Sequence, residues 1–319
     1  MEQMCEGLRA REYALSKNHS LRNKLVDVQS ALSLINDNDV LAIGGTVITR
    51  DPYMLIWNII KAKKRNLTVV RTMFSFEALL FAVSGVAKKF ITSWMSIAGP
   101  LGISKTLSDV LNREEIELEE WSHMGILNRF LAGSMGIPFI PTYTMIGSDL
   151  VKKLPVKYIN CPFTGDKLCL VPAINPDVAI IHVQRADEYG NAEILGMPIQ
   201  DKEIALSAKK VIISAEEIVS NDYIRDKPWR TLIPHFVVDA VVHAPFGAYP
   251  TECQGYYEAD IDYLSRLATI DKTEGEKGIF NFINDSIYNR DSFYEFINSI
   301  SSSQIIKRIS VMKELMRGE

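Results

Sequence analysis

The run VLAIGGTVITR at residues 40–50 constrains the fold most, because it joins an uninterrupted apolar stretch to two glycines. An apolar run without polar alternation predicts a strand covered on both faces, as in a parallel sheet. Gly44 and Gly45 at its end let backbone N–H groups come close to a ligand. Asp51 and Pro52 then predict the start of a helix. The stretch therefore predicts a strand, a ligand-binding turn and a helix.

Strand and helix patterns alternate along most of the chain. Strands are predicted at 67–70, about 90–94, 116–118, 138–141, 178–182, 211–214 and 236–243, and helices at about 25–35, 53–61, 76–83, 124–135 and 199–208. This order predicts an α/β fold with an open, mostly parallel sheet and helices on both faces.

Two regions depart from the alternation. Residues 151–171 predict a β-hairpin insertion that turns at Thr164-Gly165-Asp166. From residue 260 the composition favours helices, including a closing helix near 304–316. We interpret residues 1–19 as an N-terminal extension and residues 20–319 as one domain.

Composition excludes several classes of protein. A net charge of −4 over 319 residues gives no basic surface for nucleic acid. No apolar run approaches the roughly 20 residues of a membrane span, and the N-terminus lacks a signal-peptide core. The 4 cysteines form no C-x-x-C pair, which argues against a zinc knuckle or a dithiol and fits a reducing compartment. We expect a cytoplasmic protein without a metal, membrane or nucleic-acid site.

The turn after the first strand matches neither a G-x-G-x-x-G fingerprint nor a phosphate-binding P-loop. Gly44-Gly45-Thr46 fits a ligand-binding turn or an ordinary strand-to-helix connection equally well. Arg50 is suited to bidentate capture of a carboxylate or phosphate. The alternative for Arg50 is a surface ion pair with Asp51 or Glu77.

His123 follows Ser122, a predicted helix cap, and therefore lies in the first turn of a helix. Histidine titrates near neutral pH, so His123 is a candidate general acid or base, although a lone histidine is more often structural. Ser96, in the loop 96–102, is a second candidate for the site wall. No carboxylate lies in a strained turn of the kind that activates a nucleophile.

Five segments resemble the A (α) subunits of class I CoA-transferases, most closely those of glutaconate CoA-transferase and of the ring-cleaving hydrolase of steroid breakdown. They are AIGGTVITRDPY at 42–53, MGIPFIPTYTMIGSDL at 135–150, YINCPFTGDKLCLVPAINPDVAIIHVQRADEYGNAEI at 158–194, SAEEIVS at 214–220 and VVDAVVHAPFGAYPTECQGYY at 237–257. They run in order over about residues 20–270, and the run at 158–194 is the most specific. The resemblance implies a CoA-transferase fold of the NagB/Rossmann-like type.

In the family that the chain resembles, the CoA thioester is attacked by a glutamate of a B-type subunit, and this glutamate becomes a glutamyl-CoA thioester. The A-type subunit lacks this glutamate and forms part of the acyl cavity. The resemblance therefore implies a B-type partner, a heterotetramer of two A and two B subunits, and a coenzyme A thioester as substrate rather than a permanent cofactor. It also implies that the first turn (Gly44, Gly45, Thr46 and Arg50) and the second small-residue turn (Gly147 and Ser148) line the substrate cavity.

His123 departs from the family pattern. The corresponding region holds a glutamine in the transferase and an acidic residue that activates water in the hydrolase. A histidine fits a transferase for a different acyl group, or a hydrolase of CoA esters or carbon–carbon bonds that uses imidazole as base. A third hypothesis is a non-catalytic sensor of sugar phosphates or acyl-CoA. Such a regulator usually carries a DNA-binding module, and residues 1–20 lack a basic helix-turn-helix pattern. The acyl group and the choice between transfer and hydrolysis stay open.

Overall fold

Strand β1 (Val40–Ile43) lies inside the main sheet, as its unbroken apolar run predicts. In a computed structural model, which describes residues 15–97, 99–300, 305 and 309, β1 pairs in parallel with β2 (Leu67–Val70) and with β10 (Val178–Asp187). Because both edges of β1 are hydrogen-bonded to other strands, the turn that follows it is positioned by the sheet itself.

The main sheet has nine strands within the described part of the chain, and its principal order is β13-β11-β10-β1-β2-β4-β6, with β12 and β14 continuing from β10. The remaining strands of this sheet are β4 (Ala87–Thr92), β6 (Glu117–Glu120), β11 (Ala192–Glu193), β12 (Lys210–Val219), β13 (Thr231–Ile233) and β14 (Ala240–His243). Only the pairings of β11, with β10 and with β13, are antiparallel. The predicted mostly parallel sheet is therefore confirmed.

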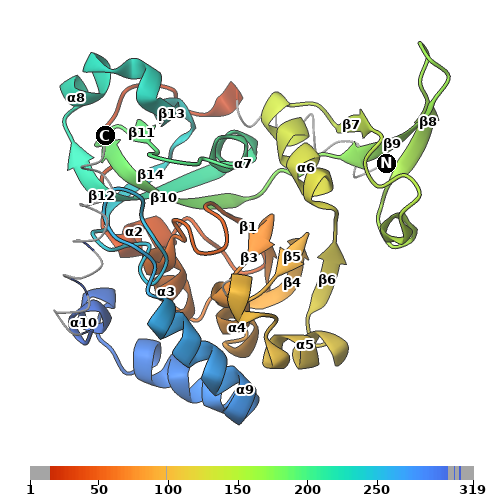
Figure 1. The fold of residues 1–319 in the computed structure, drawn as a ribbon. Helices are drawn as coiled ribbons and strands as arrows, with labels where there is room; N and C mark the ends of the chain where they lie inside the picture. Colours follow the sequence, from red (N-terminus) through yellow and green to blue (C-terminus); the bar gives the residue numbers. More distant parts are fainter. Residues whose placement is uncertain (1–14, 98, 301–304, 306–308, 310–319) are drawn as a thin grey trace.

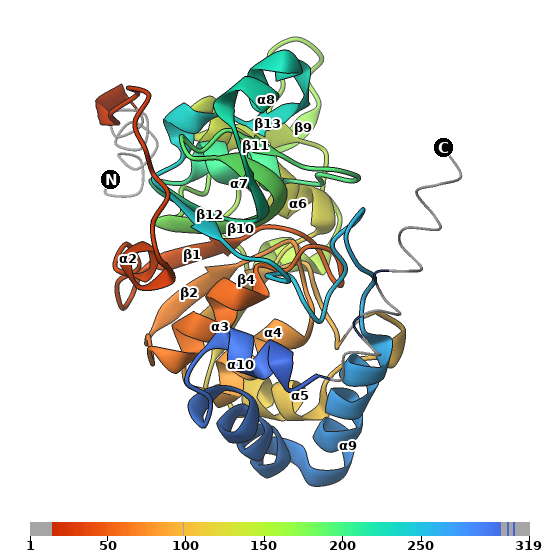
Figure 2. The same cartoon turned by 90° about the vertical axis from the view of Figure 1, so that its left-hand side faces the viewer.

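Helices cover both faces of this sheet (Figures 1 and 2). They are α2 (Val28–Leu32), α3 (Tyr53–Lys61), α4 (Phe76–Val83), α5 (Lys105–Asn112), α6 (His123–Met135), α7 (Asp201–Ser207), α8 (Asn221–Asp226), α9 (Ile261–Ile283) and α10 (Phe293–Asn298). Figure 2 shows α3, α4, α9 and α10 on one side of the sheet and α6 and α7 on the other.

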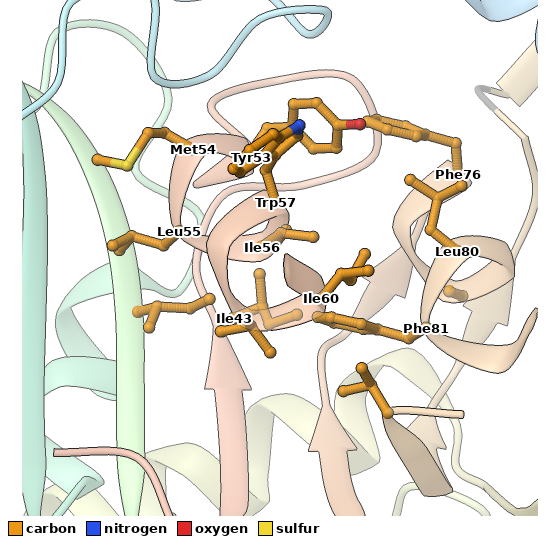
Figure 3. Packing of buried hydrophobic residues seen from close by; sticks show 14 of the residues in the cluster. Ile43, Tyr53, Met54, Leu55, Ile56, Trp57, Ile60, Phe76, Leu80 and Phe81 are labelled. Atoms are coloured by element: carbon orange, nitrogen blue, oxygen red, sulfur yellow. The ribbon is translucent and has the colours of Figure 1, made fainter. Parts of the chain in front are cut away.

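The alternation of side chains along β1 explains the two covered faces. Leu41 and Ile43 point into the larger apolar cluster with α3 and α4, whereas Ala42 points into a second cluster with α6 and α7. In Figure 3, Tyr53 of α3 points toward Phe76 of α4, and Ile43 lies below them. The rings of Tyr53 and Phe76 lie 5.1 Å apart. Each face of the strand is therefore anchored in its own core.

The predicted insertion is a separate antiparallel sheet that projects from the body of the molecule (Figure 1). It contains β7 (Phe139–Thr142), β8 (Lys157–Asn160) and β9 (Lys167–Pro172), in the order β7-β9-β8. The hairpin of β8 and β9 is confirmed. The strand that begins at PFIP belongs to this small sheet and not to the parallel alternation.

Several predicted boundaries were wrong. The predicted helix at about 25–35 is confined to Val28–Leu32, because Leu25 instead forms a bridge with Val241 of β14. The strand predicted at 236–243 begins only at Ala240, after a 3₁₀ turn. Strands β3 (Met73–Phe74) and β5 (Trp94–Met95), which pair in parallel, were not predicted. The predicted closing helix near 304–316 lies outside the described residues except at 305 and 309.

The helical C-terminal region is confirmed by α9, a π-helical turn at Asn284–Tyr288 and α10. Among the described residues, no helix combines the length and the apolar character needed to cross a bilayer.

A buried ion cluster ties the first helices to the sheet. Arg71, just past β2, binds both Asp51 before α3 and Glu77 in the first turn of α4. All three side chains are at most 1% exposed. Removing the shared cation would leave two buried carboxylates without a compensating positive charge, which is more costly than losing an exposed ion pair.

We therefore expect Arg71→Met to lower the free energy of unfolding by about 3–5 kcal/mol, measured by urea denaturation. The control is Lys105→Met, which removes the exposed pair of Lys105 with Asp109 and should cost no more than about 0.5 kcal/mol. Equal small losses in both variants would contradict a structural role for the cluster.

Candidate active site

The chain leaves β1 in a tight turn over residues 44–50. Thr46 and Thr49 exchange backbone hydrogen bonds, with N···O distances of 2.9 and 2.7 Å. Positive φ angles occur at Gly45 (67°), Val47 (46°) and Arg50 (54°). Such angles are uncommon for residues other than glycine, and least favourable for a β-branched side chain such as Val47. A turn of this kind persists only where its surroundings hold it.

The carboxylate of Asp201, the first residue of α7, is the main support of the turn. Its Oδ1 accepts a hydrogen bond from the Gly45 N–H at 2.8 Å, and its Oδ2 accepts one from Arg50 Nη2 at 2.7 Å. The side chains of Arg50 and Asp201 are 1% and 0% exposed. Arg50 also donates to the carbonyl oxygens of His182 and Met197. One buried ion pair therefore fixes both ends of the turn.

Gly44 and Gly45 must be glycines because other protein atoms lie too close for a side chain. A Cβ atom on Gly44 would lie 2.5 Å from Asp201 Oδ1, and one on Gly45 would lie 2.5 Å from the backbone oxygens of Thr49 and Arg50. These distances are shorter than any normal contact of a methyl group. The glycines thus allow the carboxylate and the folded-back backbone to reach the turn.

The loop before α9 holds the other side of the turn. Glu252 exchanges backbone hydrogen bonds with Ile48 and Arg50, each with an N···O distance of 2.8 Å. The Thr49 hydroxyl also donates to Glu252 Oε1 at 2.7 Å. The carboxylates of Glu252 and Asp201, which both touch the turn, are therefore engaged in holding it.

A buried polar cluster lies beside the turn. His182 Nε2 is 2.8 Å from Glu216 Oε1, and His182 Nδ1 is 2.9 Å from the Ser214 hydroxyl. With Cys253, these histidine and glutamate side chains are the one group of metal-ligand type found among the described residues. The Tyr257 hydroxyl also donates to Glu216. Because the histidine and carboxylate already bind protein groups, the cluster serves as a structural support.

Burial, together with the neighbouring charge of Glu216, raises the pKa of the Cys253 thiol well above its usual value, although Arg50 opposes this shift. The nucleophilic form of cysteine is the thiolate. Cys253 is therefore a protonated, unreactive part of the support around the turn.

His123 is the first residue of α6 and its side chain is exposed. The predicted cap is confirmed, because Ser122 Oγ accepts a hydrogen bond from the Gly125 N–H at 3.0 Å. Strands β4 and β6 are neighbours, so Ser93 after β4 and His123 after β6 meet at one edge of the sheet. His123 Nδ1 lies 2.7 Å from Ser93 Oγ.

A chain of hydrogen bonds runs from His123 toward the glycine turn. Ser93 Oγ donates to the Thr72 carbonyl oxygen at 2.6 Å, and the Thr72 hydroxyl donates to Gln200. Gln200 directly precedes Asp201, which binds the turn. Loops after β1, β2, β4 and β6 are therefore coupled at the carboxyl edge of the sheet, where ligands of open α/β folds bind.

Two hydroxyl groups in these loops lack partners. Thr46 Oγ1 and Ser75 Oγ are buried and form no hydrogen bond with the described residues. Unpartnered buried hydroxyls are rare in folded proteins, and a group of this kind is available to a water molecule or a ligand. Thr46 belongs to the predicted site, whereas Ser75 was not predicted.

The other predicted site residues lie on separate loops. Ser96 is buried and accepts a hydrogen bond from the Gly99 N–H at 2.8 Å. Gly147 is exposed with a φ of 84°, and Ser148 Oγ accepts from the Leu150 N–H. Met145, in the same turn, packs against Gly125 of α6. The second turn therefore lies beside the helix that carries His123.

Arg50 occupies a different environment from either sequence-based interpretation. The predicted surface pair with Asp51 or Glu77 is wrong, because both of these carboxylates bind Arg71. Direct capture of a substrate carboxylate by Arg50 stays a prediction, and a substrate would have to compete with Asp201. Ser93 and Asp201 were not predicted from the sequence, because no local motif marks either residue.

The fold is that of a known enzyme family. The chain matches the coenzyme A transferase family over residues 25–244 and therefore belongs to it. It is 36% identical to the A subunit of the 3-oxoadipate CoA-transferase of Pseudomonas knackmussii over 231 residues, which cover 71% of this chain and 80% of the relative.

Similarity extends over nearly the full length of a second relative. The chain is 29% identical to the A subunit of the glutaconate CoA-transferase of Acidaminococcus fermentans over 302 residues, which cover 89% of this chain and 94% of the relative. The crystal structure of that enzyme matches with a TM-score of 0.84, over 89% of this chain and 95% of the solved chain.

A hydrolase subunit is also similar. The chain is 25% identical to the IpdA subunit of the cholesterol ring-cleaving hydrolase of Rhodococcus jostii over 264 residues, which cover 80% of this chain and 89% of the relative. Both enzyme types expected from the sequence are therefore represented among the relatives.

The close approach at Gly45 leads to a stability test. We expect Gly45→Ala to lower the free energy of unfolding by about 2–5 kcal/mol, because the methyl group combines an unfavourable positive φ with a backbone clash. Gly165→Ala is the matched control, since Gly165 has a φ of 80° but open space where a Cβ atom would lie.

The control should lose only about 1–2 kcal/mol. Thermal and urea unfolding of both variants measures the difference. Equal losses would show that the contacts around Gly45 do not constrain the turn.

Proposed function

We propose that this chain is the A-type subunit of a two-subunit CoA-transferase, which moves CoA between carboxylic acids. A glutamate of the B-type partner attacks the thioester carbonyl and displaces the CoA thiolate, which gives an acyl–glutamyl anhydride. The thiolate then attacks the glutamyl carbonyl, so that the donor acid leaves as its carboxylate and a glutamyl-CoA thioester remains. A second carboxylate takes over the CoA by the reverse steps, which free the glutamate. Membership of the coenzyme A transferase family and the relatives named as A subunits support this proposal.

The observation that carries the proposal is that the carboxylates at the turn are bound to other protein groups. Asp201 is buried and bound to Arg50 and to the Gly45 N–H, and Glu252 is hydrogen-bonded to Thr49. Both oxygens of Asp201 are engaged and cannot attack a thioester, and one oxygen of Glu252 is engaged in holding the turn. A nucleophile from another chain therefore explains a site that is well ordered but incomplete.

Within this proposal, the first turn forms one wall of the acyl cavity. Gly44 and Gly45 let Asp201 and the folded-back backbone shape this wall, and the unpartnered hydroxyl of Thr46 offers the acyl group a hydrogen bond. Arg50 acts mainly by fixing the turn through Asp201. Ser96 supports the neighbouring loop, and the exposed second turn at 147–148 forms a more distant part of the wall.

The projecting insertion is the candidate contact surface for the B-type subunit. All residues of β8 are exposed, and large apolar side chains gather on this sheet and its loops. They are Phe139 (41% exposed), Tyr143 (60%), Ile146 (39%), Tyr158 (41%), Ile159 (47%) and Phe163 (94%). Apolar patches of this kind on soluble proteins often mark interaction sites.

The proposal includes a heterotetramer of two A and two B subunits, a single domain at 20–319 after an extension at 1–19, and a location in the cytoplasm. A reducing compartment is consistent with the three cysteines in the described part of the chain, which are all free.

Hydrolysis of a CoA ester or a ring carbon–carbon bond is the second candidate function. The exposed imidazole of His123 at the carboxyl edge favours it, because such a group can activate water. The similarity to a ring-cleaving hydrolase subunit is consistent with it.

The first prediction concerns the need for a partner. The purified chain should show no CoA transfer from any acyl-CoA donor, and activity should appear when it is co-expressed with a B-type subunit. The measurement follows CoA exchange between an acyl-CoA and a carboxylic acid by liquid chromatography. Robust turnover by this chain alone would refute the two-subunit proposal.

The second prediction separates transfer from hydrolysis. In the assembled enzyme, His123→Gln should leave CoA transfer within about threefold of the unaltered rate, because the partner's glutamate performs the attack. If the enzyme is a hydrolase, loss of a general base should lower kcat by about 100-fold or more. Acceptor-dependent CoA transfer and acceptor-independent release of free CoA are measured for both proteins. A large loss of transfer activity would contradict the first proposal.

A further inference from the structure

We propose that Ser93 is a positioning residue that keeps a proton on Nδ1 of His123 and leaves Nε2 as the nitrogen that exchanges protons with a ligand. The tautomer of this candidate base follows from the hydrogen bonds at the ends of β2 and β4. Only its catalytic consequence rests on the proposed function.

The direction of the Ser93 hydroxyl is fixed by its shortest contact. Ser93 Oγ lies 2.6 Å from the carbonyl oxygen of Thr72. A carbonyl oxygen can only accept a hydrogen bond, so two oxygens at this distance require the hydroxyl proton between them. Since serine carries one hydroxyl proton, it has none left to donate to His123.

The contacts of the neighbouring Thr92 are compatible with this direction of the Ser93 hydroxyl. Its hydroxyl lies 3.0 Å from the Trp94 carbonyl oxygen and 3.1 Å from the Thr72 carbonyl oxygen. When Thr92 donates to Trp94, the two lone pairs of the Thr72 carbonyl are filled by the Ser93 N–H and the Ser93 hydroxyl. Each donor and acceptor in this group then has a partner.

The contact between Ser93 Oγ and His123 Nδ1 at 2.7 Å must therefore be donated by the ring. Nδ1 carries a proton in the neutral imidazole as well as in the imidazolium. The nitrogen that gains and loses a proton is Nε2. Among the described residues, Nε2 has no hydrogen-bond partner, and the side chain is exposed.

The position of the ring is fixed at the same time. Thr72, whose carbonyl oxygen accepts from Ser93, also donates its own hydroxyl to Gln200. Gln200 is the residue before Asp201. These backbone and side-chain contacts thus fix the position of the imidazole relative to the glycine turn. A base held in one tautomer and one orientation acts without a preceding rearrangement.

The test is ¹⁵N NMR of the chain labelled at its histidine side chains, recorded at an alkaline pH where imidazole is neutral. The signal of His123 is assigned by its loss in His123→Gln. The chain has 5 histidines, so this assignment is tractable. We expect a protonated Nδ1 and an unprotonated Nε2 in the unaltered chain.

Ser93→Ala should shift the ratio of the two tautomers by about tenfold toward the Nε2–H form, which is the effect of losing one hydrogen bond. Ser93→Thr keeps the hydroxyl and should restore the Nδ1–H form. Ser134→Ala is the control, because Ser134 lies on the same helix and donates only to a backbone carbonyl. It should leave the tautomer ratio unchanged.

An Nε2–H tautomer in the unaltered chain, or an unchanged ratio in a folded Ser93→Ala variant, would overturn the inference. The spectrum of the unaltered chain alone decides the tautomer if Ser93→Ala does not fold. Since no partner or substrate is present in the NMR sample, these outcomes are independent of whether the chain proves to be part of a CoA-transferase.

Discussion

The candidate site depends on one carboxylate, that of Asp201. Its two oxygens bind the Gly45 N–H and the Arg50 guanidinium, and neither charged side chain is more than 1% exposed. A buried ion pair does not by itself add much stability, but the loss of one partner is costly. Its main effect here is geometric, because it holds a turn in which Val47 and Arg50 adopt positive φ angles.

This interaction also explains why the site looks complete and yet lacks a nucleophile. The acidic groups that touch the turn are used to shape it, and the nearby Cys253 thiol is kept protonated by burial. An unpartnered threonine hydroxyl and, at the same edge, the His123 imidazole are left for a ligand. In the proposed function, such a surface binds and orients a substrate, and the partner chain supplies the reactive group.

Much of the fold could be predicted from local patterns. Strands β1 and β2 and helix α4 were predicted with their observed bounds, because unbroken apolar runs and helical spacing directly reflect burial on the sheet. Helix α6 was found from its Ser122 cap and the glycine at 136. The helix predicted around Leu25 was too long, since the same apolar spacing suits a residue that bridges to a distant strand.

The interactions within the site could not be predicted in this way. Arg50 and Asp201 are 151 residues apart in the sequence, and Ser93 and His123 are 30 apart. Local spacing carries no information about such pairs, so Arg50 was assigned to the substrate although the fold provides it with a buried partner. The resemblance to CoA-transferase A subunits pointed to the turn at 44–50 as a candidate wall of the acyl cavity, which stays a prediction, and the three-dimensional contacts show which protein groups each of its residues binds.

The central claim is that the reactive carboxylate belongs to a partner chain. The most direct measurement is intact mass spectrometry of both subunits once the assembled complex has been incubated with an acyl-CoA and no acceptor. The account predicts that one coenzyme A becomes covalently attached to the B-type subunit, while the mass of this chain stays unchanged. Attachment of coenzyme A or the acyl group to this chain would contradict the account.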